Sequence, residues 1–208
     1  MPSATPSPAL PTPGTTGAIP DTARLRELAL QPGDTAGVSA GASGSHDVHP
    51  NELRPLSPAE RSTPCSTMWG LLRQHGAQAA ISQTFDTDEP GKPQVNLLAS
   101  HTAAGAETVF SQLRSAVAAC PSAGEDGRTV AVRYEDLDGT GFPEDTIRIR
   151  MTITDEGATE PPEVIDRIVT RVGVCIADLS GMGPEPYPRL AQGPALRQIE
   201  RLRAAQGL

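Results

Sequence analysis

The chain has 208 residues, enough for one domain of ordinary size. Aromatic residues make up only 3% of it, whereas glycine and proline contribute 20 and 21 residues, so the core must be built from small aliphatic side chains joined by many turns. The 25 acidic residues outnumber the 17 basic ones, and a net charge of −8 repels the phosphate backbone of nucleic acid. The composition therefore argues against a nucleic-acid partner.

The first 20 residues combine proline with serine, threonine, alanine and glycine and carry almost no charge. Such a mixture cannot bury apolar area, so we predict a disordered tether over residues 1–20 and a single domain over residues 21–208. No apolar run approaches the roughly 18 residues that would span a bilayer. Met1 opens on a polar segment, so we expect an export signal to have been removed or mis-annotated. The alternative is a cytosolic protein.

Four segments have apolar residues at the three- and four-residue spacing of helices. In the first of them, Thr22 is the expected N-cap; in the second, Cys65 lies on the inward face. Between these two helices, residues 31–58 are rich in glycine, serine, proline and aspartate and long for a loop. The predicted helices span residues 22–30, 62–76, 103–119 and 194–206.

The alternation of apolar and polar residues predicts strands. Residues 79–87 and 94–101 flank the turn at 88–91 and indicate an antiparallel hairpin, and residues 129–134 add another strand. In the strand 146–154, isoleucine and methionine face inward while Arg148 and Arg150 face outward.

A further apolar run covers residues 164–179. There we expect Ile168, Val172, Val174 and Ile176 to share the buried face and Cys175 to lie opposite them. Together the patterns predict an α+β fold, with an antiparallel sheet of about five strands buried on one side, helices packed on that one face, and stabilisation by a disulfide.

Six short segments occur in an order that resembles a known domain: 24–33 (RLRELALQPG), 109–114 (VFSQLR), 118–121 (AACP), 147–150 (IRIR), 168–173 (IVTRVG) and 195–197 (ALR). They resemble the sensor-type domain of actinobacterial cell-surface lipoproteins and of the extracellular part of PknH-type serine/threonine kinases. The resemblance covers about residues 21–206. It implies an envelope-anchored, non-catalytic domain with a cleft and disulfide bonds. The chain departs from that pattern in its odd number of cysteines, in lacking an anchoring segment or lipobox cysteine, and in a hydrophilic insertion at 43–58.

Three cysteines allow three single-bridge pairings, and spacing alone cannot choose among them. Cys65 and Cys120 each lie on the apolar face or at the end of a predicted helix and beside a proline, so we expect these two to be joined. Cys175 is then a small core residue. The alternative is three free thiols, as in a cytosolic protein.

Other chemistry is weakly indicated. Residues 136–142 (DLDGTGF) resemble the start of a calcium loop, but the twelfth position is Ile147 instead of glutamate, so a turn is favoured. His46 and His49 lack further ligands at a characteristic spacing, and we expect solvated histidines and no metal. Arg148 and Arg150 share one strand face, where they could contact an anion; the alternative is the solvent side of a sheet. We identify no catalytic residue and no cofactor-binding motif.

Together with what the resemblance implies, these patterns predict a non-catalytic ligand-binding or sensor-type domain, extracellular and held at the cell surface through an N-terminal anchor that this sequence does not show. The ligand, a small molecule or a cell-wall component, would lie in a cleft between sheet and helices bordered by residues 31–58. The alternative is a structural or protein-interaction domain of the envelope without a small-molecule pocket. A cytosolic enzyme would require several ionisable side chains converging in one pocket.

Overall fold

The computed structural model describes residues 9–11, 18–34, 44–85, 94–125, 127–137, 140–142, 145–187 and 189–208. In chain order, the helices and strands of these residues are α1 (Thr22–Leu28), β1 (Gly44–Asp47), the 3₁₀ turn η1 (Pro50–Glu52), α2 (Pro64–Leu72), β2 (Ala79–Phe85), β3 (Gln94–Ser100), α3 (Ala103–Ala118), β4 (Ser122–Glu125), β5 (Arg128–Asp136), β6 (Thr146–Asp155), β7 (Glu163–Val172), β8 (Cys175–Pro184) and α4 (Gln192–Gln206).

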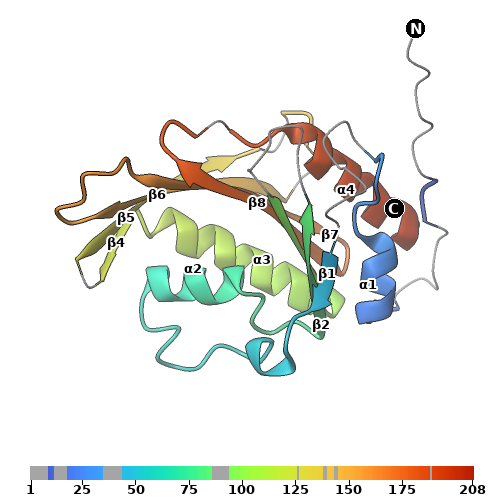
Figure 1. Ribbon diagram of the computed structural model, residues 1–208. Coiled ribbons are helices and arrows are strands. Elements are labelled where there is room, and N and C mark those ends of the chain that lie inside the picture. Colours follow the sequence, from blue (N-terminus) through green and yellow to red (C-terminus); the bar gives the residue numbers. More distant parts are fainter. Residues whose placement is uncertain are drawn as a thin grey trace, which may run out of the picture.

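All strands of the described residues belong to one antiparallel sheet of eight, in the order β1-β2-β3-β8-β7-β6-β5-β4 (Figure 1). The predicted α+β class and the predicted hairpin of β2 and β3 are confirmed, although the turn predicted at 88–91 lies outside the described residues. The expectation of about five strands was wrong. The edge strands β1 and β4 have only four residues each, too few for a recognisable alternation, and the run 164–179 is two strands.

Helices cover both faces of this sheet, so the prediction of helices on one face was also wrong. α2 and α3 pack together on one face, and α1 and α4 lie on the other (Figure 1). The neighbouring residues Ile168 and Val169 of β7 accordingly belong to two different core clusters. Apolar residues at both parities of a strand indicate burial on both sides, and β7 has this pattern.

The turn between β7 and β8 changes which side chains share a face. Gly173 adopts φ 56°, and the chain reverses there, so that Val172 pairs with Cys175 across the turn. Cys175 therefore packs on the same face as Val172, in the cluster beneath α1 and α4, whereas Ile176 belongs to the cluster beneath α2 and α3. The predicted placement of Cys175 opposite Val172 was wrong because the prediction treated residues 164–179 as one continuous run, without a turn at Gly173.

Side-chain caps set the starts of the first three helices. Asp21, not Thr22, accepts the hydrogen bond from the Arg24 amide at the start of α1. Thr63 caps α2 in a reciprocal capping box. α2 ends at Leu72, earlier than predicted, because residues 73–76 form turns in which Gln74 has φ 64°. Within the described residues no helix is both long and apolar enough to cross a membrane.

A buried set of amides fastens α1 to the sheet and to α4. The Asn96 amide donates to the side-chain oxygens of Gln83 and Gln198, at 3.1 and 2.9 Å. Gln83 in turn donates to the Leu30 carbonyl at 2.7 Å, and Gln198 donates to the Leu28 carbonyl at 2.9 Å. Carbonyls at the end of α1 and just after it are thus satisfied inside the protein, where leaving them unpaired would destabilise the fold.

Candidate functional site

Four arginines line one cavity of about 590 Å³ on the face that carries α1 and α4. Arg148 and Arg150 come from β6, Arg133 from β5, and Arg189 from the connection between β8 and α4. In the sheet register Arg133 lies directly opposite Arg150, and side chains at such positions point to the same face. The pair predicted from the sequence is therefore joined by two arginines that sequence spacing did not connect to it.

Beside the helices, part of this sheet face is covered by the crossing segment, which we define as residues 185–187 and 189–191. Its backbone is held by side chains of the sheet. Arg150 Nη2 donates to the Tyr187 carbonyl at 2.6 Å, and Arg148 Nη2 donates to the Leu190 carbonyl at 3.2 Å. The Leu190 amide donates to Asp166 Oδ2 at 2.7 Å. Arg148 is consequently only 5% exposed, which overturns the expectation that this strand face is solvated.

Two glycines of β8 make room for the crossing segment. A Cβ at Gly183 would lie 2.7 Å from Cδ2 of the Tyr187 ring, and a Cβ at Gly181 would lie 2.9 Å from Cδ2 of Leu190. Contacts this close do not occur, so the segment lies on the sheet only because these positions lack side chains. Spaced glycines in a strand are the sequence signal that could have indicated this contact.

Three polar atoms at this site are buried without a hydrogen-bond partner: Arg148 Nε, Arg150 Nη1 and Asp166 Oδ1. Arg148 Nη1 lies 4.0 Å from Asp166 Oδ2, so this carboxylate offsets the charge of one guanidinium. Among the described residues, no carboxylate forms a comparable pair with Arg150. Two guanidinium N–H groups therefore retain capacity to bind an acceptor.

The single disulfide of the described residues joins Cys65 at the start of α2 to Cys120 just after α3, with 5.1 Å between the Cα atoms. The predicted pairing is confirmed. Cys175 is a buried free thiol, as predicted, and burial raises its pKa to about 12. At neutral pH the Cys175 thiol therefore remains protonated and is a poor nucleophile. A cavity of about 620 Å³ lies beside the disulfide, between Trp69 and Arg128.

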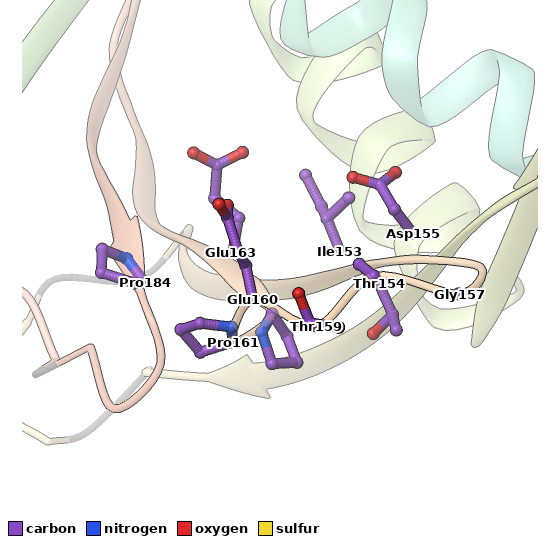
Figure 2. Close-up of a pocket in the computed structure, with 11 residues that line it drawn as sticks. Ile153, Thr154, Asp155, Gly157, Thr159, Glu160, Pro161, Glu163 and Pro184 are labelled. Carbon is purple, nitrogen blue, oxygen red and sulfur yellow. The ribbon is translucent and has the colours of Figure 1, made fainter.

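A second polar cavity, of about 670 Å³, lies at the tip of the β6–β7 hairpin. Figure 2 shows Pro184 of β8 facing the hairpin across this cavity. Its lining includes three carboxylates, but Asp155 is already engaged by Arg128 at 2.7 Å, and this hydrogen bond lowers the pKa of Asp155. No group of three or more potential metal ligands occurs among the described residues. The tip offers acidic groups and prolines but few hydrogen-bond donors.

An apolar cavity of about 550 Å³ lies between α1, the start of α3 and the end of α4, where Leu28, Val174 and Leu208 line it. The predicted ligand cleft is different, because residues 31–58 were expected to border it. Of these residues, 35–43 lie outside the described part of the chain, so that cleft stays a prediction.

The remaining candidate ligands are dispersed. His46 lies on the exposed strand β1, and His49 caps η1 by accepting the Asn51 amide through Nδ1 at 3.2 Å. The calcium-like stretch includes Asp138 and Gly139, which the structure does not describe; Thr140 donates through Oγ1 to the Leu137 carbonyl, as in a turn.

Comparison with known proteins finds similarity among solved structures. No family model matches the chain, and no curated protein matches it by sequence. Among solved structures, the chain is similar to the extracellular domain of PknH from Mycobacterium tuberculosis, with a TM-score of 0.53 and 14% sequence identity, covering 90% of this chain and 98% of that one. At this identity the similarity shows a shared fold. The PknH-like fold expected from the sequence is therefore confirmed.

Proposed function

We propose that this protein is a non-catalytic ligand-binding domain of the sensor type that works outside the cytoplasm, anchored to the cell envelope. The observation that carries this proposal is the disulfide between Cys65 and Cys120. Disulfides form and persist in oxidising compartments, and in the cytosol most thiols stay reduced. The shared fold with an extracellular domain supports the same location.

Binding without turnover is supported by the chemistry of the described cavities. The arginine cavity offers N–H donors but no nucleophile beside a general base, and the thiol of Cys175 is buried with a pKa of about 12. Burial also lowers the pKa of His101, which is not among the residues that line the cavities described above. Preformed donors in a concave surface are suited to holding a ligand.

The test is a non-reducing tryptic map of protein from fractionated native cells, with free thiols blocked before lysis. Cleavage after Arg61, Arg73, Arg114 and Arg128 places the two bridged cysteines on peptides 62–73 and 115–128. The proposal predicts that these two peptides are joined and that the protein is found in the envelope or extracellular fraction. Free, blocked thiols in a cytosolic protein would overturn it.

A second candidate function, a protein-interaction domain of the envelope, is favoured by one apolar side chain. Met182 of β8 is 53% exposed, and its register partner Ile165 of β7 lies beside it. Ile165 is partly buried against the core, so Met182 is the exposed apolar side chain suited to contact with a partner protein. A photo-crosslinking residue at position 182 should capture a partner at the cell surface that the same residue at exposed Arg203 does not capture.

A further inference from the structure

We propose that the arginine cavity binds a small anion through a carboxylate or phosphate group, with Arg150 and Arg148 as the central contacts and Arg133 at the rim. The proposal rests on the proposed function, because it names the class of ligand that such a domain would bind. The apolar cavity beside α4 and the acidic hairpin tip offer no comparable set of free donors.

The first argument comes from the unpaired N–H groups. Arg148 Nε and Arg150 Nη1 are buried and have no acceptor. A buried donor without an acceptor typically destabilises a protein by about 1–3 kcal/mol, and by more for a charged group, so such atoms are rare unless a further molecule satisfies them. Guanidinium groups present N–H donors in a planar fork that matches two oxygens of a carboxylate or phosphate.

The second argument comes from charge. The protein has a net charge of −8, yet four guanidinium groups and only two carboxylates line this cavity. Glu135 pairs at 2.8 Å with Arg189, which also lines the cavity, and the other carboxylate belongs to exposed Glu185. Asp166 offsets the charge of Arg148, so the positive excess comes from Arg133 and Arg150. A cavity with a local excess of one charge attracts ligands of the opposite sign.

The third argument is that the two central arginines are already positioned. Arg150 donates one N–H to the Tyr187 carbonyl of the crossing segment, and Arg148 donates one N–H to the Leu190 carbonyl. This fixes each guanidinium and leaves another N–H for the ligand. Binding to groups that are already ordered loses little side-chain entropy, which favours affinity.

The experiment follows arginine Nε–Hε signals of the full oxidised chain by NMR at low ionic strength. Inorganic phosphate and acetate are titrated separately, with chloride as the control for ionic strength. We expect saturable shifts of the cavity arginines with one or both probes and none with chloride. The probe that binds more tightly identifies which of the two oxyanions the cavity prefers.

Variants test the placement. Arg133→Gln removes a rim charge without touching the crossing segment and should weaken binding about threefold to tenfold. Arg203→Gln makes the same charge change at an exposed position of α4 and should leave binding unchanged. Arg150→Lys retains the charge but loses the planar second donor, and should weaken binding about tenfold.

Two results would overturn the proposal. One is the absence of a saturable shift with either anion. The other is that Arg133→Gln and Arg203→Gln weaken anion binding equally, because this would indicate a nonspecific response to the net charge of the protein. Neither result bears on the location of the protein, which the joined cysteine peptides decide. If the protein is found at the cell surface but does not bind anions, only the proposal of an anion site fails. If it is cytosolic with free thiols but binds anions, only the proposed function fails.

Discussion

Removal of the disulfide should destabilise the fold by an amount that follows from the length of the loop that the disulfide closes. The bridge joins Cys65 to Cys120 across a sequence separation of 55 residues, which includes β2, β3 and α3. Cross-linking a loop of this length lowers the entropy of the unfolded chain and should contribute about 4 kcal/mol at 25 °C. Since small domains are stable by about 5–15 kcal/mol in total, the loss is a large fraction of the whole.

The measurement is equilibrium unfolding in urea of the double variant Cys65→Ala/Cys120→Ala. Both it and its reference carry Cys175→Ala, so that the remaining thiol cannot exchange with the bridge. At a typical slope of about 2 kcal/mol per molar urea, the midpoint should fall by about 2 M. The slope itself should rise, because an unbridged unfolded chain exposes more surface.

The reasoning is refuted if the two proteins differ by less than about 1 kcal/mol. Reduction of the reference protein provides an independent comparison, since it opens the bridge without changing either side chain. If the double variant loses far more stability than the reduced reference, lost packing at buried Cys120 and not chain entropy causes the difference.

Three further perturbations test the packing and electrostatics. Asp166→Ala leaves buried Arg148 without its carboxylate and should lower the free energy of unfolding by about 3 kcal/mol in urea melts. Gly183→Ala places a Cβ against the Tyr187 ring and should destabilise by about 1–3 kcal/mol, with faster hydrogen exchange in the crossing segment. Burial lowers the pKa of His101, so only the unfolded state takes up the proton near pH 6; stability should fall as the pH decreases below about 6.5, and less steeply in His101→Gln.

Each of these perturbations has a matched control. Glu135→Ala breaks an exposed ion pair with Arg189 and should cost less than about 1 kcal/mol; an equal cost for Asp166→Ala would contradict its burial argument. Gly44→Ala adds a Cβ in a strand with no atom within 4 Å and should be nearly neutral. For His101, unfolding at pH 5 and pH 8 is compared between the two proteins, and parallel pH dependences would refute the assignment.

Local patterns in the sequence were enough to predict the helices and the strands β2, β3, β5 and β6, whereas β7 and β8 were predicted as one run. The spacing of Phe110 and Leu113 on α3 and the alternation along β6 are imposed by burial of one face of each element, so they are visible in a short window of residues. The disulfide was also predictable, because Cys65 and Cys120 each lie beside a proline at a helix that needs a partner.

What the sequence by itself determined, then, is the class of fold and its main elements, because these depend on residues close together in the chain. The cysteine pair, 55 residues apart, was predicted from the local setting of each cysteine. Only the tertiary structure decided the second helical layer and the arginine cavity. Arg133, Arg150 and Arg189 come from separate segments, and no local pattern shows that strand register and the crossing segment bring them together. The same packing buried Arg148, because α4 and the crossing segment cover a sheet face that alternation alone marks as exposed.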